Sequence, residues 1–149
     1  MALLVVNSSE RASGKVRPRH ARRGAHAVEF AFVGILMFVF VLGLVEVGRA
    51  LMVQHLLINA ARQGCRVGVI AGKSNSDITT TATNALTAQG VSGETATVQV
   101  NDGSTDAVNA KTGDEITVIV SVPASRITWV PGVRFLTGNI SGQYTLRRE

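Results

Sequence analysis

The chain is 149 residues long, 46% of them hydrophobic, and its formal net charge is +5. This length accommodates one ordinary domain plus a membrane segment. The positive charge lies in residues 1–24, which hold six basic residues and one glutamate, whereas residues 25–149 hold nine basic and nine acidic residues. The larger part therefore has no excess of basic charge to follow a phosphate backbone, which argues against a nucleic-acid partner.

An apolar run follows the basic arm. Residues 25–45 carry no charged side chain other than Glu29, and as a helix these 21 residues are about 31 Å long. That length matches the hydrocarbon core of a bilayer, which is about 30 Å thick. Under the positive-inside rule, the basic arm predicts a membrane helix with a cytoplasmic N-terminus.

Glu29 places a carboxylate near the start of this apolar run, five residues after Gly24. A charge inside a membrane helix is costly, so it usually has a partner and a role. The succession of Gly24, Ala25, Glu29 and Phe30 resembles a type IV prepilin processing site. The resemblance implies cleavage after Gly24 by a prepilin peptidase, which would make Glu29 the fifth residue of the mature chain.

The same resemblance implies a partner for Glu29. Cleavage would free the amine of Ala25, which is mostly protonated at neutral pH. In a bundle of cleaved subunits, Glu29 would meet the amine of its own or a neighbouring chain, and this pairing offsets part of the desolvation of both charges. Glu29, with Phe30 beside it, is therefore expected to set the register of assembly.

Two other interpretations of the N-terminal region stay open. An uncleaved signal anchor needs only the basic arm and the apolar run, and its outer domain would bind a ligand or a protein partner. It would leave Glu29 as an isolated charge just inside the membrane. A cleaved and secreted binding module would require processing near residue 48, but residues 44–49 contain no small-x-small cleavage pattern.

The helical pattern continues past the membrane run and becomes amphipathic over residues 46–66. Polar residues recur every three to four positions: Gln54, His55, Asn59, Arg62, Gln63 and Arg66. Apolar residues fill much of the remainder: Leu51, Val53, Leu57, Ile58 and Ala61. We expect Glu46 and Arg49, three positions apart, to pair at the outer membrane interface. The pattern predicts one helix over residues 25–66, half in the membrane and half outside it.

Three segments carry a more specific resemblance: residues 44–49 (Leu-Val-Glu-Val-Gly-Arg), 59–66 (Asn-Ala-Ala-Arg-Gln-Gly-Cys-Arg) and 144–149 (Tyr-Thr-Leu-Arg-Arg-Glu). They look like the signature of TadE-like proteins, which are pseudopilins of the tight-adherence (Flp) pilus system. The family-motif residues of the helix are Glu46, Gly48, Arg49, Asn59, Arg62, Gly64 and Arg66. The chain departs from the pattern at Cys65, where alanine is common, and at Phe30, where the major Flp pilins tend to have tyrosine. Its length argues against the major pilin.

The sequence pattern of residues 67–149 predicts a small outer domain. Ser74 to Asp77 are expected to cap a short helix over residues 77–89. Alternation of apolar and polar side chains then predicts three strands. The inward-facing positions are Ile78, Ala82, Ala85 and Leu86 on the helix, then Ala96, Val98 and Val100, then Ile116, Val118, Val120 and Val122, and finally Ile140, Tyr144 and Leu146. The predicted fold class is α+β: a long N-terminal helix, a small three-stranded antiparallel sheet and one short helix.

Reactive groups that would suit an enzyme do not converge in this sequence. The three histidines have no second histidine or cysteine at ligand spacing, so no metal site is expected: they are His20, His26 and His55. Cys65 is the single cysteine and has no disulfide partner within the chain. We therefore expect a non-enzymatic protein with no cofactor.

Two other features of the sequence resemble sites. Asp102, Ser104 and Asp106 copy the first three ligand positions of a calcium loop, but the twelfth position is Gly113 instead of glutamate, so an exposed Asn-Asp-Gly turn is favoured. Trp129 lies between the second and third predicted strands. It is expected either to pack in the core or to belong to a contact surface.

The sequence as a whole predicts a basic leader over residues 1–24, a membrane and amphipathic helix over 25–66, and an extracytoplasmic α+β domain over 67–149. The resemblance implies a minor pseudopilin of the bacterial inner membrane, with its C-terminal domain periplasmic or extracellular and incorporation in the fibre left open. Its expected partners are prepilin peptidase, other pilins and pilus assembly proteins, and inner-membrane lipid.

Overall fold

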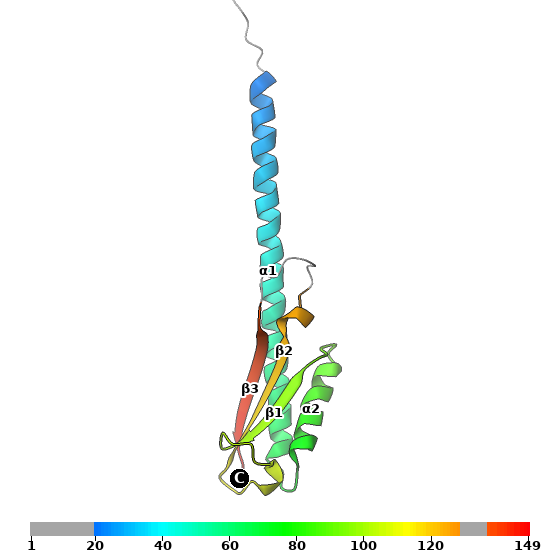
Figure 1. Cartoon of the computed structure of the whole chain (residues 1–149), viewed down its shortest axis with the longest axis vertical. Helices are drawn as coiled ribbons and strands as arrows, with labels where there is room; N and C mark the ends of the chain where they lie inside the picture. The colour runs from blue at the N-terminus through cyan, green and yellow to red at the C-terminus, as the bar shows by residue number, and fades with distance from the viewer. Residues whose placement is uncertain (1–19, 129–136) are drawn as a thin grey trace, which may run out of the picture. The chain divides into compact units, whose positions relative to one another are not determined.

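The computed structural model describes residues 20–128 and 137–149, and its first element is the helix α1, His20–Gly68 (Figure 1). The chain divides into two units, Met1–Val39 and Phe40–Glu149, and α1 contributes to both. The predicted helix is confirmed, but it begins at His20, before the expected boundary at residue 25. Gly24 and Ala25 therefore lie within continuous helix in the uncleaved chain.

In the first unit, α1 presents apolar side chains with nothing packed on them. Every residue from 24 to 39 is exposed, and Phe30, Phe32 and Phe38 are each about two-thirds exposed or more. The helix is long and apolar enough to cross a membrane. Because exposing large apolar side chains to water is unfavourable, this surface requires lipid or another apolar helix around it.

The second unit holds a three-stranded antiparallel sheet in the order β1-β2-β3. Its strands are β1, Thr95–Val100, β2, Glu115–Pro123, and β3, Asn139–Arg147. The register places Val118 opposite both Val98 and Tyr144. A second helix, α2, Asn75–Thr87, packs beside β1 (Figure 1), and the 3-10 turns η1, Ala107–Asn109, and η2, Ala124–Arg126, flank β2. The predicted α+β fold class is confirmed.

Helix α2 begins two residues before the predicted start because Ser74 caps it. The Ser74 hydroxyl accepts a hydrogen bond from the backbone of Asp77, and the Asp77 carboxylate accepts one from the backbone of Ser74, which forms a capping box. The backbone N–H of Ser74 lowers the pKa of Asp77. Threonine is a weak helix former, and in α2 Thr81 and Thr87 turn their hydroxyls to carbonyls one turn earlier.

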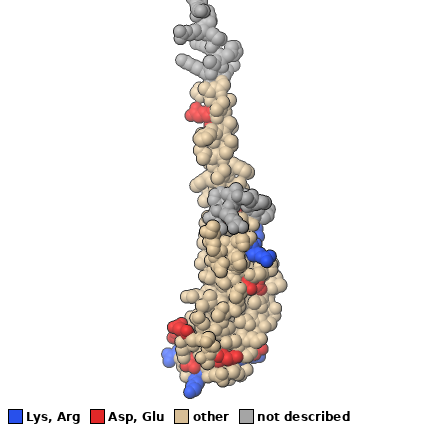
Figure 2. All heavy atoms as spheres, viewed as in Figure 1, with Lys and Arg blue, Asp and Glu red and all other residues tan. Residues whose placement is uncertain are grey.

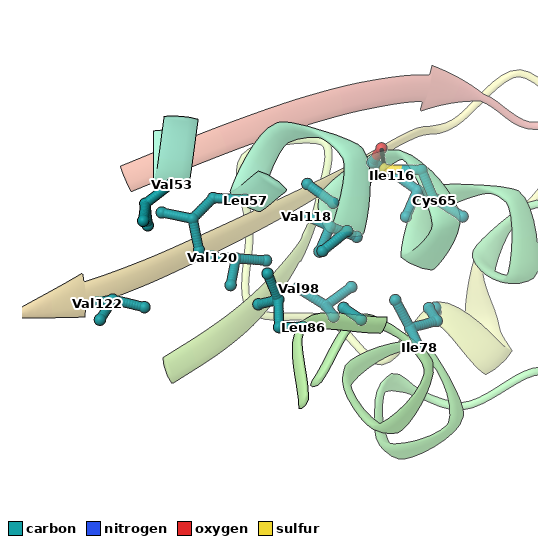
Figure 3. Packing of buried hydrophobic residues seen from close by; sticks show 14 of the residues in the cluster. Val53, Leu57, Cys65, Ile78, Leu86, Val98, Ile116, Val118, Val120 and Val122 are labelled. Atoms are coloured by element: carbon teal, nitrogen blue, oxygen red, sulfur yellow. Dashed lines mark hydrogen bonds between the residues drawn. The ribbon is translucent and has the colours of Figure 1, made fainter. Parts of the chain in front are cut away.

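The core lies where α1 and α2 meet one face of the sheet (Figure 3). The alternate residues of β2 are completely buried, as the alternation predicts: Ile116, Val118, Val120 and Val122. Leu57 and Cys65 reach this face from α1, and Ile78 and Leu86 reach it from α2, all four with no exposed surface. Each large apolar side chain buried here contributes about 2 kcal/mol to folding.

Two glycines allow the elements to approach closely. A Cβ at Gly142 of β3 would lie 2.6 Å from the backbone nitrogen of Ile58, so the strand touches the backbone of α1. A Cβ at Gly68 would lie 2.9 Å from Cδ1 of Ile78, where the start of α2 packs against the end of α1. Helix α1 is therefore an integral part of the domain from its middle to its end.

The segment that resembles the start of a calcium-binding loop, residues 101–106, begins with a tight turn. Asn101 and Asp102 have φ values of 50° and 60°, and Val100 and Gly103 exchange backbone hydrogen bonds across them. The Asp106 carboxylate accepts bonds from the backbone of Asn75 and Val108, so it holds α2 and η1 in place. The predicted exposed turn is confirmed.

Charged side chains of the domain are unevenly distributed. In the view of Figure 2, acidic and basic residues gather at the end of the domain that carries the C-terminus, and most of the remaining visible surface is uncharged. Trp129 lies outside the described residues.

Candidate functional site

The residues of the predicted processing site lie on the exposed part of α1. Gly24 and Ala25 are exposed, and a Cβ at Gly24 would meet no atom within 4 Å. Phe30 is 79% exposed. A protease therefore meets no steric barrier from the described residues at the Gly24–Ala25 bond, although the bond lies within helix.

Glu29 has one neighbour of potentially opposite charge among the described residues. His26 Nδ1 lies 3.8 Å from Glu29 Oε2, with both side chains more than three-quarters exposed. This contact is an ion pair only when His26 is protonated. The i, i+3 spacing of His26 and Glu29 is the signal in the sequence from which this contact could have been predicted. Glu29 therefore lacks a permanently cationic partner in this part of the uncleaved chain.

The seven family-motif residues do not form one cluster. Glu46 and Gly64 are buried, and Gly48, Asn59 and Arg66 are exposed. Arg62 stacks on an aromatic ring, and Arg49 lines a surface cavity. The motif thus combines residues that are buried in the domain with residues that lie on the exposed face of α1.

Glu46 differs most from its predicted role. Its side chain is only 5% exposed, and Oε1 has no hydrogen-bond partner among the described residues. The predicted Glu46–Arg49 pair is wrong, because the described part of the chain holds no ion pair between these residues. A buried carboxylate oxygen without a donor is costly. Burial of Glu46 could not be inferred from helix spacing because it arises from the tertiary fold.

Arg62 and Cys65 join α1 to β3. The Arg62 guanidinium lies 4.8 Å from the centroid of the Tyr144 ring, a distance typical of a cation–π contact. The Cys65 thiol donates to the carbonyl of Tyr144 at 3.0 Å and lies 3.5 Å from that of Ile116. Burial raises the pKa of Cys65 to about 11, so it remains a protonated thiol at neutral pH. Cys65 has no exposed surface.

Gly64 and Arg66 end the motif with different roles. A Cβ at Gly64 would lie 3.3 Å from Cγ2 of Ile78, so this glycine provides the surface on which α2 packs. Arg66 is exposed in the last turn of α1, where its charge favours the C-terminal end of the helix dipole.

The C-terminal segment closes the far end of the domain. Arg148 is 7% exposed, and its Nη1 donates to the carbonyls of Ala107 and Ala110 at 3.0 and 2.8 Å. Arg147 Nε donates to the Gly113 carbonyl at 3.0 Å. These arginines position the loop before β2, a role that sequence spacing alone did not indicate.

The described residues contain no group of three histidine, cysteine, aspartate or glutamate side chains placed to hold a metal ion.

The structure thus defines a protein that pairs an exposed apolar helix end, suited to membrane anchoring, with an α+β domain built around the rest of the same helix. Residues 24–66 match the family described as TadE-like protein. Over this helix the chain is therefore similar to TadE-like proteins, and the match begins at the predicted cleavage residue Gly24 and ends at the last motif residue, Arg66. TadE-like proteins belong to tight-adherence pilus systems. The C-terminal resemblance over residues 144–149 lies outside the match and stays a prediction. No curated protein and no solved structure matches the chain.

Proposed function

We propose that the chain is a non-enzymatic, minor pilin-like subunit of a tight-adherence pilus system. Its precursor inserts with the N-terminus in the cytoplasm and is cleaved after Gly24 by prepilin peptidase. The mature chain then joins pilus assembly, with the outer domain on the periplasmic or extracellular side. The family match over residues 24–66 and the exposed apolar end of α1 support this proposal.

The observation that carries the proposal is the environment of Glu29. This carboxylate lies in an apolar stretch, is largely exposed, and has only His26 as a nearby titratable partner among the described residues. Inside a bilayer such a charge is unfavourable by itself. The Ala25 amine released by cleavage supplies a cation four residues away, from the same chain or from a neighbouring subunit.

Packing of the outer domain on α1 gives the helix a second role. Gly142 and the Cys65 thiol attach β3 to the helix by direct contact. Residues 40–68 and the sheet therefore belong to one compact unit. A subunit that enters a helical bundle through its N-terminal end would carry this domain with it.

The experiment that tests the proposal separates processing from assembly. Gly24→Arg should block cleavage and leave a full-length membrane protein, because it replaces the residue before the scissile bond. Glu29→Leu should leave cleavage largely intact and impair pilus assembly, because the amine loses its carboxylate. Processing is read from the mass of the membrane-bound chain and assembly from pili sheared from cells.

A matched control is His26→Leu, which removes the only described titratable neighbour of Glu29 and keeps the carboxylate. It should be cleaved and should assemble like the wild type. Normal piliation by Glu29→Leu would refute the pairing, whereas retention of residues 1–24 by the wild-type chain would favour an uncleaved anchor whose outer domain binds a partner.

A further inference from the structure

A surface cavity of the outer domain brings two arginines together from distant parts of the chain. It has a volume of about 160 Å³ and is lined by α1, the turn after α2, the end of β2 and η2. Arg49 enters from α1 and Arg126 from η2, and Ser92 lies in the turn between them. The Arg126 side chain runs along this turn, since a Cβ at Gly93 would lie 3.5 Å from its Nε.

Neither arginine is neutralised in the part of the chain that the structure describes. Neither guanidinium forms an ion pair or donates a hydrogen bond there, and both residues are exposed. Glu94 follows the turn but does not line the cavity. An anion that binds between two cations offsets their mutual repulsion, and planar guanidinium groups match phosphate oxygens with paired hydrogen bonds.

The cavity also has an apolar side. Val53, Val122 and Ile127 are all buried and line it together with the arginines. A bare inorganic ion gains nothing from such a surface. A phosphate that is esterified to an aliphatic group would place its carbons there, so the lining favours a lipid headgroup.

The position of Arg49 along α1 agrees with this ligand. It lies four residues after Val45, the end of the apolar run, which corresponds to about 6 Å of helix. The headgroup layer on each side of a bilayer is roughly 5–8 Å thick. If residues 25–45 span the hydrocarbon core, the Arg49 side chain is at the level of the lipid phosphates.

We propose that this cavity binds the phosphate of a membrane lipid headgroup, with Arg49 and Arg126 as cationic ligands and the Ser92 hydroxyl as a further hydrogen-bond donor. Free phosphate shares the recognised chemistry. The proposal depends on membrane anchoring through α1 but not on cleavage after Gly24 or on pilus assembly. Its failure would therefore leave the proposed function untouched.

The test uses the full-length chain in a non-ionic, phosphate-free detergent, with binding of short-chain phosphatidylglycerol measured by native mass spectrometry. Arg49→Ala combined with Arg126→Ala should weaken binding by about tenfold or more, because the phosphate loses both of its charge-assisted hydrogen-bond donors. Arg126→Gln retains most of the side chain and should weaken it about threefold or more. The matched control is Arg66→Ala, which removes one exposed arginine from the same helix outside the cavity and should leave binding unchanged.

Competition distinguishes the two sources of phosphate. If millimolar inorganic phosphate displaces the lipid, the site is supported and free phosphate is also an occupant; if it does not, the lipid assignment is supported. Unchanged lipid binding by Arg126→Gln and by the folded double variant would overturn the proposal. So would a double variant that loses binding of a polyglutamate peptide while it keeps the lipid, because the cavity would then serve an acidic protein. Circular dichroism checks the fold, and Arg126→Gln alone carries the test if the double variant is unfolded.

Discussion

One helix, α1, has two different environments in this protein. Residues 24–39 are exposed along their whole circumference, with large apolar side chains that nothing in the described chain covers. From residue 53 onward the same helix buries one face against a sheet and a second helix, through Val53, Leu57 and Cys65. We expect lipid or other subunits to stabilise the first stretch, whereas the second is stabilised by its own chain. Substitutions in the first stretch should therefore affect assembly, and substitutions in the second should affect the stability of the isolated chain.

The largest expected loss of stability is for Ile78→Ala. Ile78 of α2 is completely buried against Gly64 and Gly68 of α1. Its truncation should lower the free energy of unfolding by about 4 kcal/mol. Urea unfolding of the detergent-solubilised chain, followed by circular dichroism, measures the change. Ile70→Ala is the matched control, since Ile70 is 54% exposed and its truncation should have little effect. Equal losses for the two variants would show that the core is wrongly assigned.

Gly142→Ala should lower the free energy of unfolding slightly less, by about 3 kcal/mol. The added Cβ would press against the backbone of Leu57 and Ile58 and push β3 away from α1. The same unfolding experiment measures it. Ser141→Ala, at the exposed neighbouring position of β3, is the control and should be nearly neutral. A neutral Gly142→Ala would contradict the close approach of strand and helix.

Alkaline pH should destabilise the domain through Cys65. Burial raises the pKa of this thiol to about 11 from its ordinary value of 9.0, so the folded state keeps the proton that the unfolded state loses. Stability is therefore full below pH 9 and falls by about 2 kcal/mol as the pH rises to 11. The difference between the wild type and Cys65→Ala isolates this contribution from those of other titrating groups. A difference that is independent of pH would contradict the burial of the thiol.

The smallest expected effect on stability is for Phe38→Ala in the exposed stretch. Phe38 is 65% exposed, and its truncation should change the free energy of unfolding in detergent by less than about 0.5 kcal/mol. If other subunits cover this stretch, the same variant should reduce the yield of sheared pili. A large loss of stability in the solubilised monomer would remove the contrast between the two stretches.

Features that depend on local periodicity could be predicted from the sequence. The strict alternation of Ile116, Val118, Val120 and Val122 identifies the buried face of β2, and Ser74 with Asp77 identifies the start of α2 to within two residues. The 3.6-residue period of the outer half of α1 predicts its polar face, but Leu51, expected among the apolar residues of the helix, is 53% exposed.

Features that depend on contacts between distant residues could not be predicted. Arg62 meets Tyr144 only because the register of β3 brings it beside α1, and nothing local distinguishes Gly142 from a flexible glycine. Burial of Glu46 and convergence of Arg49 with Arg126 likewise arise from the tertiary fold. The residues of the predicted processing site, in contrast, are neighbours in the sequence, because Gly24, Ala25 and Glu29 lie within six residues on one helix.

The central claim is that the exposed end of α1 becomes an assembly element once the chain is cleaved after Gly24. It is tested most directly by the intact mass and N-terminal sequence of the chain from membranes, with and without active prepilin peptidase. The account predicts a chain that begins at Ala25 only when the peptidase is active. A chain that keeps residues 1–24 in both cases would contradict it.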